Sequence, residues 1–176
     1  MNNGFDIVTS TYIWEMILIV AISAQHRHAV GNIKNFQSAK GFGNFIGNKA
    51  GLGASFSVYD SLFTVFNVHL HAGQKNMEKR IEMMSELSRE YKLGNENIDA
   101  IELSDYAFII GDFNFRMNTT FSNIIDKIDS IKEEMHLDEF HIIKNTTESF
   151  CLFNEGKKNF QPTYKREHKS NSYLNK

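Results

Sequence analysis

The chain has 176 residues, enough for one domain with a substantial core. Apolar residues make up 41% of it and there is a single proline, a composition that excludes a disordered chain. The 19 basic and 21 acidic residues give a formal charge of −2, so no overall basic field favours nucleic acid as a partner.

Cysteine content and hydropathy indicate the cellular compartment in which the protein is found. The single cysteine, Cys151, cannot form an internal disulfide, which suits a reducing environment. The apolar run at 17–22 is far shorter than the roughly 20 residues that cross a bilayer. No signal-peptide pattern begins at Met1. We therefore expect a cytoplasmic protein without a transmembrane segment.

The first part of the chain predicts strands and a glycine-rich loop. Residues 5–9 and 13–23 are expected to be strands, the second covered on both faces because it is apolar nearly throughout. The His-x-His pair at 26–28 could share a metal, but a solvated loop is favoured without further ligands. Residues 31–53 hold six glycines. In this segment Lys49 could bring a cation to phosphate, although a simple turn is favoured if the loop stands alone.

Alternating apolar and polar residues then predict a β-hairpin over 52–59 and 62–70. Asn67, His69 and His71 share one face near the end of the returning strand. Polar groups at a strand end suit a functional site. For a single histidine, a core residue with a satisfied ring is the alternative.

A helix and a short apolar strand follow. Residues 76–91 are expected to be helical, with apolar residues at 3- and 4-residue steps on the core face. The strand 107–110 is of the kind that lies buried in a sheet. After it, alternation places Asp112, Asn114 and Arg116 on one face of an extended segment. An acid can orient or deprotonate a water, an amide can donate to a phosphoryl oxygen, and arginine can bind phosphate. A strand with a solvated turn is the alternative.

The last third of the chain predicts two helices and extended segments. A helix is expected from caps at 118–120 through about residue 130, and a second over 132–140. Residues 150–165 are expected to be extended. The polar tail at 166–176 lacks apolar periodicity and is expected to be frayed.

Four short stretches now combine in a fixed order along the chain. They are Gly-Asn-Lys at 47–49, Asn-Val-His-Leu at 67–70, Gly-Asp-Phe-Asn-Phe-Arg at 111–116 and Pro-Thr-Tyr-Lys at 162–165. Over about residues 5–165 they resemble the catalytic domain of inositol polyphosphate 5-phosphatases, within the endonuclease/exonuclease/phosphatase superfamily. The Gly-Asp-x-Asn element is shared with the nucleases of the superfamily, whereas Pro-Thr-Tyr-Lys points to the phosphatases.

The resemblance implies a fold, a reaction and a substrate class. The fold is α/β, a four-layer sandwich of two mixed β-sheets flanked by helices. The reaction is Mg²⁺-dependent, in-line attack of water on the 5-phosphate of a phosphoinositide headgroup or a soluble inositol polyphosphate. Peripheral contact with a membrane follows from a lipid substrate.

The resemblance also implies roles for particular residues. Asp112 would activate the water, while Asn114 and His69 would bind the phosphoryl oxygens. We expect His69 and Asp112 at the ends of neighbouring strands of one sheet. The residues with expected substrate contacts are Lys49, Asn67, Arg116, Tyr164 and Lys165, the last two at the neighbouring 4-phosphate.

The chain departs from the family pattern in several places. Ala50, Val68 and His71 replace other residues within the motifs. The early Asn and Glu that hold the metal in the family, and its late Asp-His pair, have no match, so the metal ligands are unknown. The fold is therefore expected to be incomplete at both ends, with apolar strand faces exposed along one edge.

These departures leave several readings of the chain open. A fragment, a truncated gene model and a degenerate copy all fit. The alternative function is a catalytically inactive remnant that binds phosphoinositides or a protein. Nuclease activity is disfavoured by the Pro-Thr-Tyr-Lys stretch and by the absence of a basic stripe.

Overall fold

The computed structural model describes residues 4–38, 49–93, 98–119, 136–146, 151–156, 166–170 and 172–173. The chain divides into two compact units, Met1–Asn114 and Phe115–Lys176. The elements of the first unit are β1 (Phe5–Ile13), β2 (Met16–Ser23), the 3-10 helix η1 (Ala24–Ala29), β3 (Val30–Ser38), β4 (Ala50–Val58), β5 (Ser61–His69), α1 (Met77–Glu90), β6 (Lys92–Leu93), β7 (Ile98–Asp99), α2 (Ala100–Leu103) and β8 (Tyr106–Asp112).

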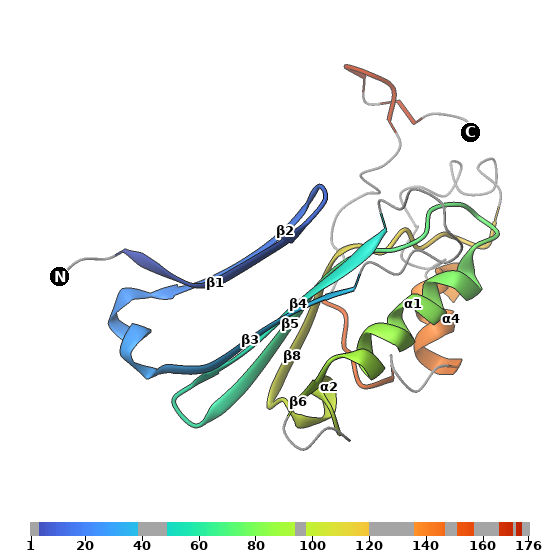
Figure 1. Ribbon diagram of the computed structural model, residues 1–176. Helices are drawn as coiled ribbons and strands as arrows, with labels where there is room; N and C mark the ends of the chain where they lie inside the picture. The colour runs from blue at the N-terminus through green and yellow to red at the C-terminus, as the bar shows by residue number, and fades with distance from the viewer. Residues whose placement is uncertain are drawn as a thin grey trace. The chain divides into compact units, whose positions relative to one another are not determined.

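A mixed sheet with the strand order β3-β4-β5-β8 forms the centre of the first unit (Figure 1). Strands β3, β4 and β5 are antiparallel neighbours, as the alternating pattern of the hairpin predicts. Strand β8 joins β5 in parallel, after a connection that contains α1. A parallel pair requires such a crossover, and it brings the ends of β5 and β8 to the same edge of the sheet.

Helix α1 covers one face of this sheet (Figure 1). Gly51 of β4 lies so close to α1 that a side chain at this position would overlap the buried Leu87. Next to α1, Tyr91 stacks on Phe36 with 5.0 Å between ring centroids and meets Phe66 edge-on at 5.7 Å. The predicted helix is thus confirmed, and its Met and Leu stripe packs on the sheet.

The antiparallel hairpin β1–β2 covers part of the opposite face. Leu18 of β2 forms a buried cluster with Leu52 and Ala54 of β4, whose side chains alternate with the glycine that faces α1. The Asn67 side chain donates from Nδ2 to the Ile17 carbonyl over 3.0 Å, which ties β2 to β5. Two β layers and α1, with the buried Ala100 of α2, therefore form the described core of this unit.

One predicted strand boundary and two predictions about strand burial are wrong. The segment expected as one strand over 13–23 contains the turn at Trp14 (φ 50°), and β2 begins at Met16. Ile17 and Ile19 are 56% and 53% exposed, so β2 is covered on one face only. Strand β8 is also half open, with Phe108 at 50% exposure. Among the described strands β8 lies at the sheet edge, next to β5, to which the hairpin is bonded through Asn67.

The second unit contains one described helix, α4 (Glu139–Thr146). Met117 and Asp138 form an antiparallel bridge, and the Glu139 amide donates to the Arg116 carbonyl over 2.9 Å. Ile143 of α4 is fully buried. Within the described residues, no helix is long and apolar enough to span a bilayer.

Several C-terminal expectations need correction. Of the helix expected over 132–140, residues 139–140 are helical, but α4 begins only at Glu139, after the bridge, and continues to Thr146. Cys151 is helical and exposed, not extended. The first expected helix lies largely outside the described residues. In the polar tail, the Arg166 guanidinium donates to the Tyr173 hydroxyl over 2.8 Å.

The close approach of β4 to α1 predicts a cost for any side chain at Gly51. Gly51→Ala should lower the free energy of unfolding by about 1–3 kcal/mol, because the added methyl group overpacks against Leu87. Urea denaturation measures the change. Gly4→Ala, where a Cβ meets nothing within 4 Å, is the matched control. Equal stabilities of the two variants would contradict the packing described here.

Candidate functional site

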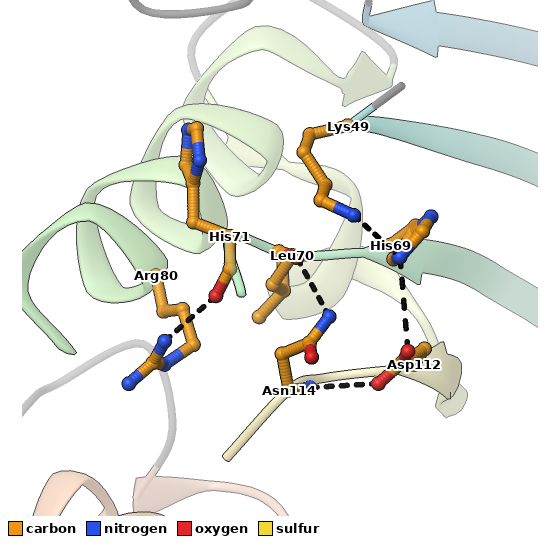
Figure 2. Close-up of polar contacts among 7 residues, drawn as sticks. All are labelled: Lys49, His69, Leu70, His71, Arg80, Asp112 and Asn114. Atoms are coloured by element: carbon orange, nitrogen blue, oxygen red, sulfur yellow. Dashed lines mark hydrogen bonds and ion pairs between the residues drawn. The ribbon is translucent and has the colours of Figure 1, made fainter. Parts of the chain in front are cut away.

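His69 and Asp112 lie opposite each other at the ends of β5 and β8 (Figure 2). Their side chains face each other, with 3.7 Å between His69 Nε2 and Asp112 Oδ2. The imidazole is 30% exposed and the carboxylate 63% exposed. The prediction that these residues end neighbouring strands of one sheet is confirmed.

Gly111 makes this approach possible. It has φ +119°, a conformation that side-chain-bearing residues rarely adopt, and a Cβ here would overlap the Val68 carbonyl of β5. One residue further on, the Asp112 carbonyl accepts a hydrogen bond from the Leu70 amide over 2.9 Å. The ladder between β5 and β8 therefore continues beyond the catalytic candidates and fixes their backbones.

Asn114 holds the carboxylate and the neighbouring loop in place (Figure 2). Its backbone amide donates to Asp112 Oδ1 over 2.9 Å, while its side-chain Nδ2 donates to the Leu70 carbonyl over 3.0 Å. The residue has φ +53°, a left-handed conformation that asparagine tolerates better than most residues. One oxygen of Asp112 is thereby anchored, and the other faces His69.

Lys49 brings a cation to the same place from the start of β4. Its Nζ lies 2.6 Å from His69 Nε2. Desolvation by burial lowers the pKa of Lys49, and the negative charge of Asp112 acts in the opposite direction. When the ammonium is protonated it donates to His69, whose Nε2 then carries no proton. A cation, an imidazole and a carboxylate thus form a row over three adjacent strands.

Asn67 and His71 have different surroundings from those expected. The side-chain amide of Asn67 donates to the Ile17 carbonyl of the β1–β2 hairpin. Strand β5 ends at His69, so the alternation does not extend to His71, whose ring points away from His69 in Figure 2. Its Nε2 is buried and has no hydrogen-bond partner among the described residues.

The pKa of His71 is lowered. Burial is the main cause, followed by the positive charges of Lys79, Lys49 and Arg80. His71 therefore stands in a cationic environment that disfavours its own protonation.

Arg80 is a residue of this region that the sequence analysis did not identify. It is fully buried, and its Nη1 donates to the carbonyls of His71 and Gly73 over 2.7 and 2.9 Å. The sequence signal that could have shown its burial was its spacing, because residue 80 lies on the same helix stripe as Met84 and Leu87. Arg80 fixes the chain just after His69.

The other predicted positions remain predictions. Arg116 belongs to the second unit, and Tyr164 and Lys165 lie outside the described residues. Two departures from the family pattern are accommodated, since Ala50 and Val68 are buried strand residues.

The described residues lack a complete metal site. In the part of the chain that the structure covers, no three His, Cys, Asp or Glu side chains are grouped to hold an ion. In the pair at 26–28, His26 Nδ1 forms a hydrogen bond of 2.8 Å with the Tyr59 hydroxyl. Asp112 is the carboxylate beside His69, and the nearby Lys49 ammonium opposes a second positive charge.

Comparison with known proteins decides the family. The profile of Endonuclease/Exonuclease/phosphatase family 2 matches residues 1–176. The chain belongs to this family. Phosphatidylinositol 3,4,5-trisphosphate 5-phosphatase 1 of Xenopus laevis is 26% identical over 174 residues, covering 93% of this chain and 17% of the relative. Synaptojanin-2 of Rattus norvegicus is 29% identical over 174 residues, covering 98% of this chain and 12% of the relative. The resemblance to the inositol polyphosphate 5-phosphatases is therefore confirmed.

Solved structures show the fold. The inositol polyphosphate 5-phosphatase domain of a synaptojanin, solved with inositol (1,4)-bisphosphate and calcium, has a TM-score of 0.85 at 21% identity. The match covers 98% of this chain and 50% of that one, so the chain spans half of the solved domain. A nitrophorin of Cimex matches with a TM-score of 0.73 at 20% identity, which shows that this fold also serves other functions. The expected α/β sandwich is confirmed.

The buried guanidinium of Arg80 predicts a stability effect. Arg80→Met should lower the free energy of unfolding by about 1–3 kcal/mol, because two carbonyls after β5 lose their donor. Chemical denaturation followed by circular dichroism measures it. Arg89→Met changes an exposed arginine of the same helix and is the control. If both variants are equally stable, Arg80 does not hold this segment.

The lowered pKa of His71 predicts a pH dependence of stability. Unfolded His71 titrates near 6.5, whereas in the folded chain its pKa is lower. The unfolded state therefore binds a proton first, and stability falls as the pH drops below about 6.5. Thermal unfolding at pH 8 and pH 5.5 should show a smaller loss for His71→Gln than for the wild type. The exposed His141→Gln is the control, and parallel losses in all three proteins would refute the effect.

Proposed function

We propose that this chain is part of a phosphohydrolase that removes the 5-phosphate from phosphoinositides or inositol polyphosphates. The pairing of His69 with Asp112 at the ends of β5 and β8, with Lys49 in contact with the imidazole, carries the proposal. Family membership and the 5-phosphatase relatives support it. A carboxylate beside two groups that can face an anion is the arrangement that phosphoryl transfer to water requires.

In this mechanism Asp112 orients the attacking water and accepts its proton. The Asn114 amide holds Oδ1, so Oδ2 is the oxygen directed toward the reacting groups. His69 and Lys49 stabilise the negative charge of the phosphoryl oxygens, which is the main catalytic term when little covalent chemistry is needed. Contacts of Asn114 with the phosphoryl oxygens, and of Asn67, Arg116, Tyr164 and Lys165 with the substrate, are further parts of the proposal.

The magnesium ion implied by the family does not fit the described residues alone. Mg²⁺ prefers near-octahedral oxygen ligands, usually one or two carboxylates together with waters and phosphate. Beside His69 the described residues offer the single carboxylate of Asp112 and a lysine, so further ligands would come from other polypeptide. We propose on this ground that the chain is a fragment of the catalytic domain. A cytoplasmic location with peripheral membrane contact completes the proposal.

The second candidate is a catalytically inactive remnant that binds phosphoinositides or a protein. The 63% exposure of Asp112 favours it, because a general base works best in a site that excludes water. Binding would then rely on Lys49 and His69 without turnover.

Asp112→Asn tests the catalytic assignment. The substitution keeps the shape and removes the base, so turnover should fall roughly 10²–10⁴-fold. Phosphate release from a 5-phosphorylated inositol lipid with Mg²⁺ is measured in the natural protein that contains residues 1–176. Binding to vesicles of the same lipid should persist.

Asp60→Asn, in the exposed turn between β4 and β5, is the control for this test. Normal turnover of the Asp112 variant would show that this carboxylate is structural. Lipid binding without turnover in the wild type would favour the inactive remnant.

A further inference from the structure

The turn of the β1–β2 hairpin carries the single tryptophan of the chain, Trp14. Ile13 pairs with Met16, so the turn consists of two residues, Trp14 and Glu15. Trp14 has φ 50° and is 52% exposed. Two-residue hairpin turns with positive φ normally contain asparagine, aspartate or glycine, and a bulky side chain in this conformation is strained. The turn itself therefore does not account for a tryptophan at this position.

A second exposed aromatic residue with positive φ has a structural explanation that Trp14 lacks. Tyr59 has φ 51° and is 58% exposed in the two-residue turn between β4 and β5. Its hydroxyl forms a hydrogen bond of 2.8 Å with His26 Nδ1, and its ring meets those of His26 and His28 edge-on. Among the described residues, no hydrogen bond or ring contact involves the indole of Trp14.

The hairpin turn lies at the same end of the sheet as the candidate site (Figure 1). Thr9 of β1 bonds to Asn35 of β3, and Thr11 bonds to Gln37, so these two strands run in the same direction. Strand β3 ends beside the start of β4 and the end of β5. Strand β1 therefore leads toward the end of β5, and its turn projects at the end where the candidate catalytic residues lie.

Lysines lie at this end on the opposite face of the sheet, which α1 covers. Lys75 and Lys79 are exposed, the first in the segment between β5 and α1 and the second in the first turn of α1. Lys49 adds a third ammonium group at the start of β4. The hairpin turn and the lysines thus flank the candidate site on two sides. Glu15 and Glu78 belong to the same two segments, so the excess of positive charge is small.

This arrangement suits contact with a lipid bilayer. Tryptophan is favoured at bilayer interfaces, because its ring is apolar while its N–H stays in contact with water. Ammonium groups beside it can face anionic headgroups. One inserted side chain with a small net charge gives weak, reversible binding, which orients a protein on a membrane without anchoring it. The exposed carboxylate of Asp112 lies at the end that would meet the lipid.

We propose that Trp14 inserts into the headgroup region of a bilayer that carries the phosphoinositide, while Lys75 and Lys79 contact the same surface. The inference rests on the proposed function, because it requires that the substrate is a lipid and not only a free inositol polyphosphate. Trp14 is a positioning residue, which presents the candidate site to the headgroup without touching the reacting atoms. The strained conformation of the turn is then retained for the sake of the membrane contact.

Trp14→Asn separates this role from a structural one. Asparagine tolerates positive φ better than tryptophan does, so the urea midpoint of the variant should be unchanged or higher. Its affinity for vesicles of phosphatidylcholine with a small fraction of phosphatidylinositol 3,4,5-trisphosphate should fall about tenfold, because one buried aromatic side chain is lost. Co-sedimentation measures the affinity. A lower urea midpoint would show that the indole serves the fold and would overturn the proposal.

Fluorescence of Trp14 reports the insertion directly, because residues 1–176 contain no other tryptophan. The emission should shift to shorter wavelength on the vesicles and should be quenched by brominated phosphatidylcholine. The soluble headgroup, inositol 1,3,4,5-tetrakisphosphate, should cause neither change. Absence of vesicle binding, or binding with unchanged emission, would contradict the insertion. A lipid-free oligomer that Trp14→Asn dissociates would assign the turn to a protein partner and would also contradict it.

Tyr59→Asn is the matched control, since it removes an exposed aromatic residue with positive φ at the opposite end of the sheet. It should leave the vesicle affinity unchanged.

Turnover in the natural protein that contains residues 1–176 gives a second readout. Trp14→Asn should lower kcat/KM for the lipid in vesicles about tenfold and leave kcat/KM for the soluble headgroup unchanged. Equal losses on both substrates would refute the positioning role. If neither substrate is turned over, the phosphatase assignment fails, whereas the binding and fluorescence measurements still decide the membrane contact.

Discussion

The parallel pairing of β5 with β8 is the constraint on which the site depends. Without a shared register, His69 and Asp112 would not meet at 3.7 Å. That register requires a backbone approach that only glycine permits at position 111, where the conformation and the Val68 carbonyl both exclude a side chain. Glycine contributes no side chain to the packing at this position, and the continuous hydrogen-bond ladder between β5 and β8 compensates for that loss.

Beyond the strands, the polar groups of the site are held by bonds to backbone carbonyls. Asn114 donates to the carbonyl of Leu70, and Arg80 to those of His71 and Gly73. A chain that leaves a sheet has unpaired carbonyls, and buried donors from elsewhere satisfy them. The side chains of Asn114 and Arg80 therefore hold the backbone just after β5, directly beside His69.

Sequence reasoning predicted the elements that periodicity specifies and missed those that depend on neighbours. The hairpin of β4 and β5 and helix α1 follow from their patterns, and the meeting of His69 with Asp112 followed from two strands that turn polar at the same stage. The burial of strands was harder to predict, because an apolar run such as β2 or β8 has the same sequence pattern whether one face of the strand or both faces are covered. Arg80 was missed because a charge at a stripe position is normally solvated, and only the carbonyls after β5 explain its burial. The role of Asn67 in holding the hairpin likewise depends on a contact between strands distant in sequence.

The row formed by Lys49, His69 and Asp112 has a consequence for how the chain can change. His69 and Asp112 are register partners on neighbouring strands and face the same side of the sheet, while Lys49 reaches His69 from just before β4. Side chains alternate with a period of two, so inserting or deleting one residue within β5 or β8 would turn His69 or Asp112 to the helix side. Insertions and deletions within these two strands would therefore separate the pair, whereas the turn at Tyr59 and Asp60 can vary in length without moving either residue.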